Sequence, residues 1–93
     1  MTEHRSGRTA EAMRAAPRAA MFIWCNNSLS YPRGVARWLK RTDLVIVRPC
    51  DVEAALKGFD APVIVDHNAS LPAHIRLMVD AANLMHAQKR IAA

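Results

Sequence analysis

Three short apolar runs dominate the hydrophobic pattern of this chain. They cover residues 21–24, 44–47 and 63–65, and within each run the apolar positions are continuous rather than alternating. Asparagine, aspartate or proline stands within two residues of the end of every run. Continuous runs rich in β-branched residues are typical of strands that are covered on both faces, as in parallel sheets. The pattern therefore predicts three buried strands.

The stretches that follow the three runs have helical spacing. In residues 32–41 and 72–92 the apolar side chains recur every three or four positions, which predicts two amphipathic helices. Residues 51–58 predict a shorter helix, with Asp51 as its N-cap and Gly58 as its C-terminal stop. In the first of these helices, three side chains form the apolar face that is expected to pack inward: Val35, Trp38 and Leu39.

This alternation of strands and helices predicts an α/β fold. We expect a β-α-β-α-β-α unit with a three-stranded parallel sheet, right-handed crossovers, helices packed on the sheet and a long C-terminal helix. One domain is expected over residues 19–93. Residues 1–18 show no strong apolar periodicity, so we interpret them as a flexible basic arm, or as a loose helix over residues 10–16 capped by Thr9.

Composition narrows the class of protein. The 93 residues allow a single domain, and the net charge of +5 favours acidic partners such as nucleic acid or an acidic protein. The alternative is that the charge only aids solubility. Two cysteines are too few for a disulfide scaffold, and the longest apolar run, residues 19–25, is far shorter than a membrane span. We therefore expect a cytoplasmic protein with no membrane segment and no cofactor.

A basic stripe marks the first predicted helix. Its four cations, at positions i, i+4, i+7 and i+8, fall on one helix face: Arg33, Arg37, Lys40 and Arg41. Such a stripe can follow phosphates, and each contact adds salt-dependent affinity without reading sequence. Tyr31, at the start of the helix, adds a surface for stacking. The alternative is an ordinary solvated helix face.

The last predicted helix is longer than the sheet that it covers. About 20 residues of helix span roughly 30 Å, whereas a five-residue strand spans about 17 Å. Its overhang carries Leu84, Met85 and Ile91. This surplus of apolar surface predicts self-association, most simply as a homodimer. The alternative is a frayed terminus that contacts nothing.

Polar and sulfur-containing residues follow the predicted strands. In open parallel sheets, ligands usually bind beyond the carboxyl ends of the strands. Cys25, Cys50, Asp66 and His67 would meet at that rim. Cys25, Cys50 and His67 have the ligand types of a zinc site, and Cys25 with Asp66 and His67 would suit thiol catalysis. The structural alternative makes the cysteines core residues and the others turn formers.

Two hypotheses of function follow. The leading one is a small non-enzymatic binding module that associates with itself and engages an acidic partner, as an adaptor or an inhibitor. Its partner is either a nucleic-acid backbone or an acidic protein surface. The alternative is a small thiol- or zinc-dependent enzyme or metal protein that uses the residues at the strand ends.

Overall fold

The computed structural model of the protein describes the backbone of residues 3–92 and the side chains of residues 7–88. Its elements follow the predicted alternation of strands and helices, with one further helix at the start. In chain order they are α1 (Glu3–Ala15), β1 (Met21–Ile23), α2 (Ser30–Trp38), β2 (Val45–Val47), the 3-10 turn η1 (Pro49–Asp51), α3 (Val52–Ala55), β3 (Val63–Val65) and α4 (Ala73–Ala92).

The three strands form one parallel sheet in the order β2-β1-β3. Phe22 in the central strand lies opposite Ile46 on one side and Ile64 on the other. Every residue of β1 is buried, whereas Val45 in the edge strand β2 is exposed. The predicted three-stranded parallel sheet and the α/β class are confirmed.

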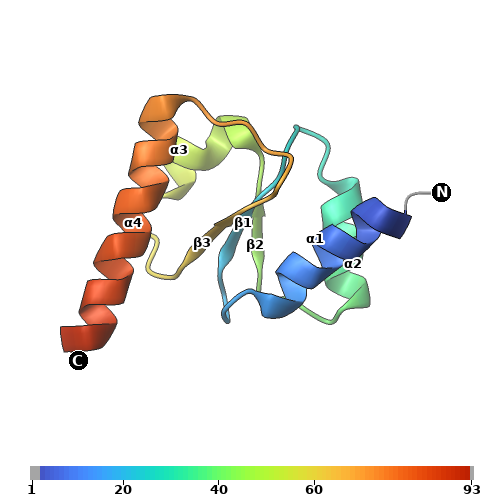
Figure 1. The fold of residues 1–93 in the computed structure, drawn as a ribbon, viewed down its shortest axis with the longest axis horizontal. Coiled ribbons are helices and arrows are strands. Elements are labelled where there is room, and N and C mark those ends of the chain that lie inside the picture. Colours follow the sequence, from blue (N-terminus) through green and yellow to red (C-terminus); the bar gives the residue numbers. More distant parts are fainter. Residues whose placement is uncertain (1–2, 93) are drawn as a thin grey trace.

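Helices cover both faces of the sheet (Figure 1). Helices α1 and α2 lie on one side, and α3 and α4 lie on the other. Because side chains alternate along a strand, Phe22 packs under α1 and α2, while Met21 and Ile23 join the cluster that includes Ile75 and Val79 of α4. The molecule is thus a three-layer sandwich, which explains why the strand sequences are apolar throughout.

The N-terminal helix corrects the prediction of an arm over residues 1–18. Thr9, Met13 and Ala16 are buried, and Met13 and Ala16 belong to the same core cluster as Phe22. These positions follow the helical spacing i, i+4, i+7. Only Met13 among them is large, so the apolar pattern is weak. Small side chains allow the helix backbone to lie close to the sheet, and docking needs few large residues.

A polar clamp holds α1 in place. The Arg41 guanidinium donates hydrogen bonds to the carbonyl oxygens of Met13 at 2.6 Å and Pro17 at 3.2 Å. Its Nε and Nη2 also reach the two carboxylate oxygens of Asp43, both at 3.0 Å. Asp43 accepts a further bond at 2.8 Å from the N–H of Ala19, whose φ is 63°. The carbonyls at the C-terminal end of α1 are thereby satisfied by a residue far along the chain.

The clamp lowers the pKa of Asp43. The hydrogen bond from the Arg41 guanidinium is the largest cause, and the backbone bond from Ala19 is the next. Both stabilise the charged carboxylate. In turn, the bond to Asp43 raises the pKa of Arg41. The pair therefore stabilises the fold in its ionised state.

Helix α2 ends at Trp38, three residues before the predicted end at Arg41. The N–H of Arg41 bonds to the carbonyl of Ala36 at 2.7 Å, and the N–H of Lys40 bonds to that of Arg37 at 3.0 Å. This pair of bonds is a Schellman motif, in which Lys40 occupies the left-handed position with φ 60°. The turn sends Arg41 back toward α1.

The two edge strands of the sheet differ in how their outward backbone groups are bonded. Beside β3, the Asn83 side chain of α4 accepts the N–H of Val63 at 2.7 Å and donates to its carbonyl at 2.9 Å. These bonds occupy backbone groups that an edge strand would otherwise leave open. Strand β2 pairs with β1 on one side alone.

Candidate functional site

The net charge of the chain is confined to one half of the sequence. Residues 1–44 contain eight Lys and Arg against three Asp and Glu, whereas residues 45–93 contain five of each. The first half forms α1, the central strand β1 and α2, so its two helices make one outer layer of the molecule. The α1/α2 layer consequently carries the whole charge of +5.

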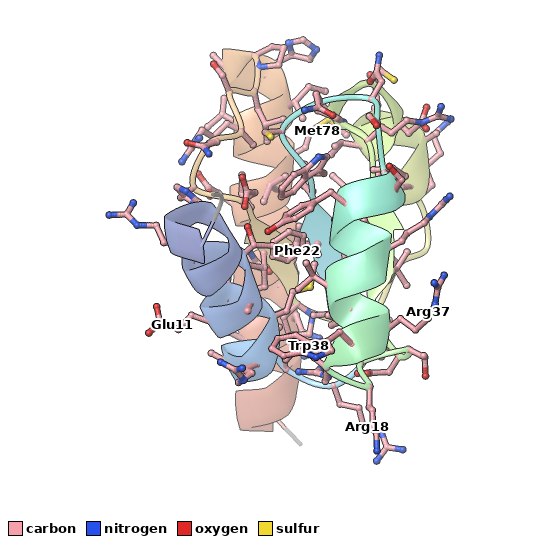
Figure 2. The ribbon with its side chains drawn as sticks, turned by 90° about the vertical axis from the view of Figure 1, so that its right-hand side faces the viewer. Glu11, Arg18, Phe22, Arg37, Trp38 and Met78 are labelled. Carbon is pink, nitrogen blue, oxygen red and sulfur yellow. The ribbon has the colours of Figure 1, made fainter. Side chains whose placement is uncertain are left out.

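Three of the four cations predicted to form the basic stripe are solvent-exposed: Arg33, Arg37 and Lys40. Within the part of the chain that the structure describes, none of the three has an ion-pair partner. Figure 2 shows Arg37 on α2 pointing away from the body of the molecule, as does Arg18 beyond the end of α1. These guanidinium groups are available to a partner.

Arg41 does not belong to this surface, which corrects the prediction. Its side chain is 19% exposed, and the clamp to α1 and Asp43 uses its donors. The physical reason is the turn at Lys40, which ends the helix before the predicted stripe is complete. Arg41 therefore has a structural role.

Trp38 also departs from its predicted place on the inward apolar face. Its side chain is 71% exposed, and Figure 2 shows it between the lower ends of α1 and α2. Together with four other residues it lines a groove of about 360 Å³: Ala10, Tyr31, Gly34 and Val35. The angular position of Trp38 on α2 lies at the shoulder of the helix, next to α1, rather than over the sheet.

Tyr31 forms the other aromatic wall of this groove. Its ring centroid is 5.7 Å from that of the buried Trp24, which stacks in turn on Phe22 at 6.5 Å. This series of rings anchors Tyr31 to the core. The predicted stacking residue thus packs against the core and lines the same groove as an exposed tryptophan that the prediction placed elsewhere.

A separate pocket of about 410 Å³ lies at the carboxyl ends of β1 and β2, where ligands commonly bind in such sheets. Asn27, Arg33 and Arg48 are among its lining residues. Arg48 forms an ion pair with Asp51 at 2.9 Å, so its charge is partly neutralised. Arg33 therefore extends the basic surface of α2 to this pocket.

The predicted zinc set of Cys25, Cys50 and His67 is not brought together. Among the described residues, no three His, Cys, Asp or Glu side chains are grouped closely enough to hold a metal ion. The strand order is the reason, because Cys50 follows β2 and His67 follows β3, on opposite sides of β1. Two strand spacings separate those edges by about 10 Å.

The residues of the thiol alternative make contacts typical of turns. Asp66 is 2% exposed, and its Oδ2 accepts the N–H of Asn68 at 3.0 Å. The His67 Nδ1 lies 3.5 Å from the Asp66 Oδ1. Cys25 accepts a bond from the Asn26 side chain at 3.7 Å. The catalytic role of Cys25, Asp66 and His67 stays a prediction without added support.

The outer face of α4 exposes the apolar surface expected to associate. Leu84 is 60% exposed and Met85 is exposed as well, whereas the Ile91 side chain lies outside the described residues. Leu77, which the prediction did not include, is 68% exposed, one heptad before Leu84. With Ala81 between them, these leucines form a stripe opposite the buried Ile75 and Val79.

Comparisons with protein-family models, curated proteins and solved structures found no match. Within the described residues, no helix has the length and apolar character needed to cross a membrane. The charges and contacts described above are therefore the basis for a function.

Proposed function

We propose that the protein is a small non-enzymatic binding module whose α1/α2 layer engages a polyanionic partner, either a nucleic-acid backbone or an acidic protein surface. One observation carries this proposal: all of the net charge of +5 falls in residues 1–44, whose two helices form that layer. A charge needed only for solubility has no reason to be confined to one layer, because solubility depends on the net charge of the whole molecule.

The kind of cation supports the same function. Arg33 and Arg37 are arginines, whose planar guanidinium matches phosphate and carboxylate groups with two parallel hydrogen bonds. They lie four positions apart, so one turn of α2 presents both on the same side. A polyanion that follows this face replaces condensed counterions, and its affinity falls as salt rises.

Self-association through α4 completes the proposal. The stripe of Leu77, Ala81 and Leu84 faces solvent on the layer opposite the basic one. Pairing two copies through this stripe would leave both basic layers exposed. Two linked sites bind an extended polyanion with greater avidity than one.

The test measures binding of a labelled polyanion across a salt series by fluorescence anisotropy. Wild-type protein should show a linear fall of log affinity with log salt, as counterion release requires. Arg37→Glu combined with Lys40→Glu should abolish binding at 0.1 M salt. Unchanged binding by this double variant would refute the proposal.

A matched control uses exposed cations on the opposite layer. Lys57 and Arg76 are exposed and lie in the half of the chain with balanced charge. Lys57→Glu combined with Arg76→Glu makes the same change in net charge as the test variant. It should keep most of the affinity, which separates a local surface from a general effect of charge.

A further inference from the structure

Gly34 occupies a position in α2 where glycine weakens the helix. It lies in the middle of a nine-residue helix, where alanine would be more stable. A Cβ built on Gly34 would meet nothing within 4 Å, so packing inside the protein does not require glycine there. Gly34 also lines the groove beside Trp38. The residue leaves the helix backbone open to close approach from outside.

Lys40, in the turn that ends the same helix, is a residue type that does not suit its backbone conformation. Its φ of 60° places it at the left-handed position of a Schellman motif, where glycine is the favoured residue. The chain thus has glycine where the helix favours alanine, and lysine where the turn favours glycine. Both residues are exposed, Gly34 within α2 and Lys40 in the turn that ends it. Strained or unfavourable choices of this kind are found at binding surfaces.

The aromatic and basic parts of this surface adjoin each other. Gly34 lies four positions before Trp38 and three before Arg37, so both side chains are its neighbours on the helix surface. Trp38 and Tyr31 give the groove aromatic walls, and Arg37 and Lys40 are exposed cations on α2 and in the turn that ends it. An occupant that contacts both parts of this surface must therefore combine a flat apolar group with adjoining negative charge.

From these observations we infer that the polyanion is a single-stranded nucleic acid. One base stacks on Trp38 over Gly34, and the adjoining phosphates bind Arg37 and Lys40. This inference rests on the proposed function. Stacking of bases on aromatic side chains between basic residues is how proteins bind single strands without sequence preference, because every base has a π-face. A duplex hides those faces, and an acidic protein has carboxylates without planar rings between them.

The test compares four labelled probes at constant salt: a twelve-residue oligothymidylate, its duplex with oligoadenylate, inorganic polyphosphate, and polyglutamate. Trp38→Ala should weaken oligothymidylate binding roughly 5- to 150-fold, the range for loss of one stacked base. Its polyphosphate binding should change less than about twofold, since the cations remain. Trp38→Phe should restore most of the oligothymidylate affinity.

A second variant tests the floor of the groove without removing an aromatic ring. A Cβ at Gly34 meets nothing within 4 Å, so we expect Gly34→Leu to keep the fold and to fill part of the groove. It should weaken oligothymidylate binding at least fivefold and leave polyphosphate binding intact. Circular dichroism of both variants should match the wild type.

Tryptophan fluorescence reports the stacking directly. The chain has two tryptophans, of which Trp24 is buried and Trp38 is exposed. Oligothymidylate should quench the wild-type emission and leave that of Trp38→Phe, which comes from Trp24, unchanged. Equal quenching in both proteins would overturn the stacking.

The outcomes separate this inference from the proposed function. If single strand and duplex bind equally and Trp38→Ala has no effect, the inference fails and polyanion binding stands. If polyglutamate binds more tightly than oligothymidylate and needs Trp38, the partner is an acidic protein and the inference is again overturned. If no probe binds, the proposed function fails as well.

Discussion

The two helical layers of this molecule are held to the sheet in different ways. Helix α4 packs through an apolar stripe that includes Ile75 and Val79, on a layer with balanced charge. Helix α1 packs mostly through small side chains around Met13, and the Arg41 clamp fixes its C-terminal end. The weak apolar pattern belongs to α1 alone, because α2 in the same layer has a clear helical periodicity. A search for hydrophobic periodicity therefore finds α2 and α4 and misses α1.

The largest expected effect tests whether α1 is part of the core. Met13 is fully buried, so Met13→Ala should lower the free energy of unfolding by about 2–5 kcal/mol. Met85→Ala, on the exposed face of α4, is the matched control and should change it by less than about 0.5 kcal/mol. Denaturant unfolding measures both. Equal values would mean that α1 is not docked as described.

Loss of the Arg41 clamp should have the next largest effect on the free energy of unfolding. Arg41→Ala removes the charged donor from the carbonyl oxygens of Met13 and Pro17, which keep only a backbone N–H each, and it breaks the pair with Asp43. We expect a loss of about 2–3 kcal/mol in the free energy of unfolding. Arg37→Ala, at an exposed arginine on α2, should cost less than about 0.5 kcal/mol. Similar losses for the two variants would contradict a clamp that only Arg41 provides.

Acid should weaken the same clamp. The pKa of Asp43 is lower in the folded state than its ordinary value of 3.8, so its stabilisation is present at neutral pH. It begins to decline as the pH falls below about 4 and is lost as the pH falls through the folded pKa. Asp43→Asn should therefore lower Tm at pH 7 and flatten the fall of Tm below about pH 4. Parallel acid profiles for the two proteins would exclude this linkage.

Replacing Lys40 should change stability and polyanion binding in opposite directions. Lys40→Gly should raise the free energy of unfolding by about 1 kcal/mol, because glycine adopts the left-handed conformation without penalty. The same change should weaken polyanion binding about fivefold at 0.1 M salt, through loss of one phosphate contact. Gly58→Ala, at a left-handed position with φ 72°, should destabilise instead. A Lys40→Gly protein that binds as well as the wild type would remove Lys40 from the site.

The smallest effect on stability belongs to the outer face of α4. Leu77→Glu with Leu84→Glu should change the free energy of unfolding of the monomer by less than about 0.5 kcal/mol, because both side chains are exposed. Sedimentation equilibrium should nevertheless shift from dimer to monomer. A wild-type protein that is monomeric at high concentration would end the association proposal.

Much of the fold could be predicted because its signals are local. Each strand is a continuous apolar run, and the sequence of elements then leaves few topologies. Docking of α1 could not be predicted in the same way, since the side chains that fix it, Arg41 and Asp43, lie 24 to 28 residues further along the chain than the groups they bond. Its own signal, the spacing of Thr9, Met13 and Ala16, is weak because two of the three side chains are small.

The candidate site was predicted in part for the same reason. Arg33, Arg37 and Tyr31 follow from the spacing within one helix, which is a local property. The exclusion of Arg41 and the exposure of Trp38 depend on where the helix ends and on what lies beside it. Gly34 did have a sequence signal, as a glycine inside a helical pattern. The prediction that Cys50 and His67 lie together was wrong, because the sequences of the strands do not say in which order the strands stand in the sheet.

The division of the molecule into a binding layer and a supporting layer can be tested most directly by nuclear magnetic resonance. Titration of the labelled protein with short oligothymidylate should shift amide signals of α2, with the largest changes near Gly34 and Lys40. Signals of α4 around Leu77 and Leu84 should stay within noise. Shifts centred on α4, or spread evenly over both layers, would contradict the assignment of the binding surface to α1 and α2.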